Sequence, residues 1–220
     1  MKIVVKPITV DVTLFASYKE SILRLVEDVD SRISLVGKLQ KLFGLRLDDI
    51  KFNRETLSGN YAHFLRGYDR TLFDVSIGLE EATSKILRAD SEEQILDLYG
   101  RLFQILDEIP ISLLRVSIGH QLAGEADSEA FLASLNPNCP AGFQDMLKGR
   151  GVQYNLQVPQ HNLEIFVILA SSLFHKGGIF LNIDSQFSPY SYDFQTAAKI
   201  IIEYYTLSLT ELGLDIQREG

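Results

Sequence analysis

Residues 163–187, LEIFVILASSLFHKGGIFLNIDSQF, hold the pattern that decides the fold of this chain. The stretch begins with an apolar run over residues 163–173, and the adjacent Gly177 and Gly178 can supply the positive φ of a tight turn. Over residues 179–187 apolar residues then alternate with more polar ones, which is the period of a strand with one buried face. The stretch therefore predicts an antiparallel hairpin that reverses at the glycines.

The first strand of this hairpin is apolar on both of its faces. If it is extended, Leu163, Ile165 and Val167 point to one side, and Phe166 and Ile168 point to the other. A strand that is apolar on both sides is typical of one that is covered on both sides. We therefore expect Phe166 and Ile168 to lie against a second surface, within the chain or on another subunit.

A long helix is predicted over residues 194–212, because its apolar residues follow the three-four spacing of a helical stripe. Gly213 is placed to close its C-terminus, as glycine often does. Ile200, Ile202 and Tyr204 lie off the main stripe, so the helix is apolar around most of its girth. Such a helix usually packs against two surfaces. Together with Phe166 and Ile168, these three residues are our predicted interface.

The rest of the chain shows further strand and helix patterns. Alternating residues predict a strand over 8–14, and Ser17 with Glu20 forms a capping box that predicts a helix start. The remaining patterns predict strands over residues 50–56, 61–66, 72–79, 114–118 and 152–158, and helices over residues 90–109 and 127–135.

The predicted elements follow the same order twice. Each of the halves 1–110 and 111–220 reads as strand, helix, three strands and helix. This order predicts an α+β fold with one or more antiparallel sheets and helices packed on one face. It also favours an internal duplication, in which the two halves pack against each other as one compact unit. Chance alternation of strands and helices is the competing explanation.

Composition narrows the classes of function. The chain has 220 residues, 46% of them apolar, and a formal net charge of −8. This charge makes nucleic-acid binding an unlikely function, because phosphates would be repelled. No apolar run is long enough to span a bilayer, and the N-terminus does not have the pattern of a signal peptide, so we expect no membrane span and a cytoplasmic location.

The sequence does not show a catalytic constellation. The four histidines are isolated, the single cysteine excludes a cysteine-based zinc site in the monomer, and the common nucleotide-binding and hydrolase motifs are absent. We therefore predict no catalytic residues, no metal and no cofactor. His120 continues the core face of its predicted strand, so we expect a buried histidine there.

A resemblance supports this reading of the C-terminal half. The strand Gly177-Gly178-Ile179-Phe180-Leu181-Asn182-Ile183-Asp184, between an apolar strand and a closing helix, resembles the C-terminal part of a sporadically distributed bacterial family of uncharacterised α+β proteins. Members of that family usually carry aspartate where this chain has Asn182. The resemblance implies the fold class and brings no catalytic residues with it.

Two functions are compatible with these observations. The first is a non-enzymatic binding or assembly module that acts as a homo-oligomer or as part of a protein complex, because apolar side chains exceed the cover that one copy offers them. The second is a ligand-binding protein or enzyme with a pocket between sheet and helices. For that pocket, we predict polar or aromatic contributions from Arg70, His120, Tyr154 and Asp184.

Overall fold

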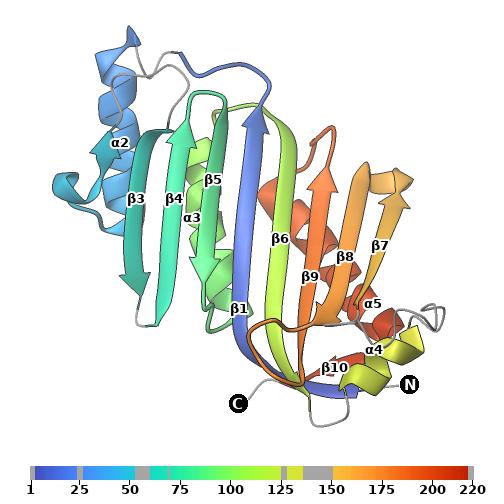
Figure 1. Ribbon diagram of the computed structural model, residues 1–220. Coiled ribbons are helices and arrows are strands. Elements are labelled where there is room, and N and C mark those ends of the chain that lie inside the picture. The colour runs from blue at the N-terminus through green and yellow to red at the C-terminus, as the bar shows by residue number, and fades with distance from the viewer. Residues whose placement is uncertain are drawn as a thin grey trace. The chain divides into compact units, whose positions relative to one another are not determined.

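The computed structural model describes residues 3–23, 27–52, 60–68, 70–124, 128–135 and 151–217. Within these residues ten strands form a mostly antiparallel open sheet, which four helices accompany, so the predicted α+β class is confirmed (Figure 1). The strands are β1 (Ile3–Tyr18), β2 (Lys51–Phe52), β3 (Asn60–Tyr68), β4 (Thr71–Gly78), β5 (Glu81–Leu87), β6 (Ile111–Gly124), β7 (Gly151–Val158), β8 (Leu163–Ser171), β9 (Gly178–Phe187) and β10 (Leu214–Ile216). The helices are α2 (Val29–Phe43), α3 (Glu92–Leu106), α4 (Ser128–Leu135) and α5 (Phe194–Leu212). In the described residues, no helix has the length and apolar character that crossing a membrane requires.

The order of strands across the sheet is β2-β3-β4-β5-β1-β6-β9-β8-β7, and β10 pairs in parallel with the beginning of β1. Outward from β1 the order is β5, β4, β3, and outward from β6 it is β9, β8, β7. The strands outward from β1 and from β6 therefore follow the same order, although the first half has four strands between α2 and α3 where three were predicted. A symmetry relation between the halves stays a prediction.

The chain divides into two compact units whose boundaries differ from the predicted halves. Unit 1 contains residues 1–11, 117–185 and 199–220, and unit 2 contains residues 12–116 and 186–198. The division passes through β1, β6, β9 and α5, because each of these elements contributes residues to both units.

Unit 2 is built around an aromatic cluster. Phe43 from α2 contacts Phe64 of β3 and Phe73 of β4, with ring centroids 5.1 and 5.3 Å apart. Tyr99 of α3 reaches Phe73 at 6.5 Å, and Figure 1 draws α3 across one face of β4 and β5. Helices α2 and α3 therefore cover the same face of this part of the sheet, as predicted.

Unit 1 contains the predicted hairpin, although its connection spans residues 172–177 rather than a tight turn at the two glycines. Strands β8 and β9 are joined by a turn in which Gly177 has a φ of +73°, a conformation that favours glycine. The odd-numbered residues Leu163 to Leu169 of β8 are buried, whereas Phe166 and Ile168 on the opposite face are half-buried. We expected both faces of β8 to be covered, but only the face with the odd-numbered residues is fully buried.

Helix α5 has the predicted bounds. Asp193 caps its N-terminus, because its carboxylate accepts the N–H of Thr196 at 2.9 Å, and Gly213 follows the helix with a φ of +71°. Ile200 is buried, whereas Ile202 and Tyr204 are half-buried.

The predicted start of the first helix was wrong. Ser17 does not cap a helix, because β1 continues to Tyr18 and Ser17 pairs with Glu81 of β5. Helix α2 begins at Val29 instead, where Asp28 accepts the N–H groups of Asp30 and Ser31. Pairing along the whole of β1 therefore overrides a local capping signal.

One strand was missed, and another predicted strand is much shorter in the structure. Strand β5 had not been predicted at all, because Glu81, Lys85 and several small residues weaken its apolar alternation. The strand predicted over residues 50–56 is the two-residue β2, and residues 53–56 lie outside the described residues, as does residue 127 of the helix predicted over 127–135.

Candidate functional site

The turn between β8 and β9 presents two apolar side chains to solvent. Leu173 is 91% exposed and Phe174 is 80% exposed. The turn has a defined conformation, because the hydroxyl oxygen of Ser172 accepts the N–H groups of Phe174 and His175 at 3.2 and 3.1 Å. The same hydroxyl donates to Gln121 of β6 at 2.8 Å. We call Leu173 and Phe174 the apolar tip. It is already ordered for contact, so a partner would not have to arrange it.

Strand β7 forms the end of the sheet in unit 1. It pairs with β8 along its whole length, from Gly151 opposite Ala170 to Val158 opposite Leu163. Among the described residues no strand lies beside its other edge, and six of its eight residues are exposed, including Tyr154 at 38% and Leu156 at 44%. Alternate backbone N–H and C=O groups on this edge point outward. Strand β7 can therefore accept another extended chain.

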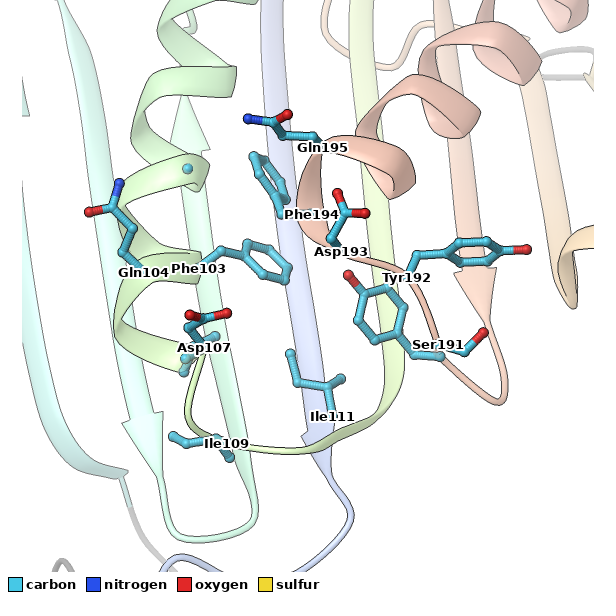
Figure 2. A pocket seen from close by; sticks show the side chains of 13 residues that line it. Phe103, Gln104, Asp107, Ile109, Ile111, Ser191, Tyr192, Asp193, Phe194 and Gln195 are labelled. Atoms are coloured by element: carbon cyan, nitrogen blue, oxygen red, sulfur yellow. The ribbon is translucent and has the colours of Figure 1, made fainter.

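Unit 2 contains a cleft of about 560 Å³ between the end of α3 and the residues around the start of α5. Phe103 and Phe194 stack in it at 4.4 Å, and Figure 2 shows Asp193 beside this pair while Tyr192 points away. The other lining residues are Gly100, Gln104, Leu106, Asp107, Ile109, Ile111, Tyr190, Ser191 and Gln195.

The cleft combines aromatic rings with negative charge. Asp107 and Asp193 are its charged lining residues, and no lysine or arginine lines it among the described residues. The N–H and hydroxyl of Thr196 donate to Asp193 and hold the pKa of its carboxyl below the usual value. Burial, assisted by the charge of Asp193, raises the pKa of Tyr190 to about 12. The Tyr190 hydroxyl is buried without a hydrogen-bond partner among the described residues. This environment suits a cation better than an anion.

His120 takes part in a buried polar pair in unit 1. The side chain is 1% exposed, as the core position in its strand predicted, and its Nε2 lies 2.8 Å from the hydroxyl of Tyr205 on α5. This hydrogen bond joins β6 to the helix that covers it. The pair therefore holds α5 in position on β6.

The structure does not bring the four predicted pocket residues together. Asp184 is buried on β9, and the 2.9 Å contact between Ser117 and Asn182 places the even-numbered side chains of β9 with the odd-numbered ones of β6. Because side chains alternate along a strand, His120 and Asp184 point to opposite faces of the sheet. Tyr154 lies on the edge strand β7.

Arg70, the fourth of these residues, is exposed in the turn between β3 and β4 of unit 2. None of the four lines the cleft at α3. Sequence patterns could not locate that cleft, because its walls come from segments about 80 residues apart in the chain.

The predicted interface residues lie in unit 1 on two elements. Phe166 and Ile168 share the half-buried face of β8, while Ile200, Ile202 and Tyr204 belong to α5. Tyr204 accepts a hydrogen bond from Gln160 at 3.0 Å, and its ring contacts His161. The apolar tip was not predicted as a site, because Leu173 reads as the end of the apolar run and the following glycines read only as a turn.

Comparison with known proteins finds no family model and no curated protein that matches this chain. The resemblance carried by residues 177–184 stays a prediction.

Proposed function

We propose that this protein is a non-enzymatic assembly module that binds further copies of itself through unit 1. The observation that carries the proposal is the apolar tip, in which two large side chains are held almost fully exposed on an ordered turn. Contacts with a partner would remove these side chains from water, at about 25 cal/mol for each Å² of apolar surface buried.

Other features of unit 1 support the same function. Phe166 and Ile168 leave an apolar face of β8 half-exposed, and β7 provides an open strand edge. Exposed apolar groups that cluster on one part of a protein typically mark an interaction surface. Several such features occur in unit 1.

The test is the mass of the purified protein in solution, measured by light scattering after size-exclusion chromatography at 5–100 µM, roughly the range in which moderate self-association becomes visible. We expect a dimer or larger assembly. The double variant Leu173→Ser and Phe174→Ser should shift the association to higher concentrations, because the tip would no longer bury apolar area. Its melting temperature should stay close to that of the wild type, because both side chains are exposed.

A matched control is the double variant Leu65→Ser and Leu72→Ser, which removes two exposed leucines from unit 2. It should leave the association unchanged. A wild-type chain that stays monomeric over the whole concentration range would refute the proposal.

A second candidate function rests on the cleft at α3. Its stacked aromatic rings, two carboxylates and the buried hydroxyl of Tyr190 favour a small organic cation such as an alkylammonium ion. Choline should raise the melting temperature by mass action, whereas its neutral isostere 3,3-dimethylbutan-1-ol should not. The variant Asp107→Asn should reduce the effect of choline. Equal responses to the two compounds would exclude a cation site.

A further inference from the structure

We infer that two copies of this chain join by antiparallel pairing of their β7 strands about a twofold axis through Asn155. The inference rests on the self-association proposed above and adds the β7 edge as a second contact surface of unit 1. It is independent of the apolar tip, which belongs to the β8–β9 turn.

The two ends of the sheet differ in the protection of their edges. At one end β2 is only two residues long and pairs with His63 and Ala62, and this edge carries Lys51 and Arg66. Short edge strands and charged side chains are the usual devices that prevent further pairing. Strand β7 has eight residues, GVQYNLQV, with no charged residue and no proline. The edge that is open to pairing is therefore β7.

The sequence of β7 is complementary to itself. Antiparallel pairing about Asn155 would place Tyr154 opposite Leu156 of the second copy, Gln153 opposite Gln157, and Val152 opposite Val158. Because a twofold axis perpendicular to the sheet keeps each face on the same side, every pair contains side chains of the same face. Aromatic and aliphatic side chains would meet on one face and amides on the other.

Each of these pairs favours a second copy over an unrelated strand. An amide carries both donors and acceptors, so Gln153 and Gln157 can bond to each other across the axis, as can the two Asn155 side chains. Tyr154 against Leu156 is an aromatic–aliphatic cross-strand pair of the kind that stabilises sheets, and both side chains are partly exposed in one copy. No pair brings like charges together, although the chain has a net charge of −8.

Pairing through one edge also limits the size of the assembly. The β2 end of the strand order is protected, so β7 is the edge available for pairing. When two copies pair through β7, this edge is occupied in both of them. Through the β7 contact alone, the product is a closed dimer rather than a fibre. Dimerisation would also satisfy the outward backbone groups of β7, which otherwise bond to water.

The register can be tested with charge pairs. In the variant Gln153→Lys with Gln157→Lys, like charges would face each other twice across the axis, and we expect the dimer dissociation constant to rise at least about tenfold. In the variant Gln153→Glu with Gln157→Lys, opposite charges would face each other, and the dissociation constant should stay within about threefold of the wild type. Sedimentation equilibrium at low salt measures the dimer dissociation constants of the wild type and of the two variants.

Two controls separate these charge effects from general ones. The variant Leu65→Lys with Leu72→Lys adds the same two positive charges to exposed positions of unit 2 and should leave the dimer intact. High salt should reduce the difference between the two β7 variants, because it screens exposed charges. Hydrogen exchange should show protection of the β7 amides that increases with protein concentration.

The outcomes distinguish this inference from the proposed function. A wild-type dimer that the two-lysine β7 variant does not weaken would overturn the β7 contact and leave self-association standing. A Gln153→Glu and Gln157→Lys variant as weak as the two-lysine variant would overturn the register about Asn155. A monomeric wild type would overturn the proposed function and this inference together.

Discussion

An aromatic cluster in unit 2 and a buried polar pair in unit 1 join helices to the sheet by different chemistry. In unit 2 the rings of Phe43, Phe64 and Phe73 pack against one another between helices and strands, and all three are almost fully buried. In unit 1 the corresponding contact between sheet and helix includes a hydrogen bond, between His120 of β6 and Tyr205 of α5.

This difference indicates how each unit is stabilised. An aromatic cluster is stabilised by burial and packing, which tolerate small shifts of the rings. A buried hydrogen bond requires a particular placement of its two partners, because a polar group left without one is costly in the interior. The aromatic cluster of unit 2 is therefore stabilised by the apolar area it buries, whereas the His120–Tyr205 hydrogen bond of unit 1 helps to fix the register of α5 on β6. Unit 1 is also the unit with the open edge of β7, and a fixed position of the sheet relative to its helix would keep this edge ready for pairing.

The largest expected effect follows from breaking the aromatic cluster of unit 2. Phe73→Ala should lower the free energy of unfolding by about 3–5 kcal/mol, because it leaves a cavity beneath α2 and α3. Urea denaturation followed by circular dichroism measures the loss. The control Leu72→Ala, at the neighbouring exposed position, should change it by less than about 0.5 kcal/mol. Equal losses of unfolding free energy in the two variants would contradict the prediction that the aromatic cluster is the core of unit 2.

A smaller effect is expected from the polar pair of unit 1. Tyr205→Phe removes the hydroxyl that contacts His120 Nε2, and it should cost about 1–3 kcal/mol because a buried polar atom loses a partner. The double variant Tyr205→Phe with His120→Phe should cost less than the sum of the two single variants. A double-mutant cycle from denaturation curves gives this coupling, and strict additivity would show that the pair does not act together.

The smallest expected effect, for each tyrosine, is a loss of stability of unit 2 at alkaline pH. Burial raises the pKa values of Tyr18 and Tyr99 above the ordinary value, with a further contribution from Glu81 at Tyr18, and burial raises that of Tyr190 to about 12. All three belong to unit 2. Because each folded-state pKa lies above the unfolded value of about 10, their contribution to stability is complete below pH 10 and is lost as the pH rises through the folded values.

At pH 10.5 this loss should be below about 1 kcal/mol for each tyrosine. Methyl NMR signals of Val75 in unit 2 and Val167 in unit 1 can report the two units separately during urea denaturation. We expect the Val75 signal to shift to lower urea concentrations between pH 8 and pH 10.5 by more than the Val167 signal. Tyr190→Phe should reduce the difference between the shifts of the two signals. Equal shifts of the Val75 and Val167 signals would contradict a specific loss of stability in unit 2.

Local patterns predicted much of the secondary structure and little of the candidate sites. The hairpin at Gly177 and the bounds of α5 were predictable, because turn chemistry and helical spacing are read within a few residues. The end of β1 was not, because Ser17 belongs to a strand pairing with β5 that the local capping signal did not reveal. The cleft at α3 depends on residues around 103 and 193, whose proximity no local pattern contains.

The sequence by itself determined the α+β class, the hairpin of residues 163–187 and the burial of His120, because periodicity and turn residues act over short distances. Only the tertiary structure decided that His120 meets Tyr205, that Asp184 points to the other face, and that β7 forms an end of the strand order. These features depend on which strands become neighbours and in what register. Strand order is set by the total burial and hydrogen bonding of the folded chain, which no short stretch specifies.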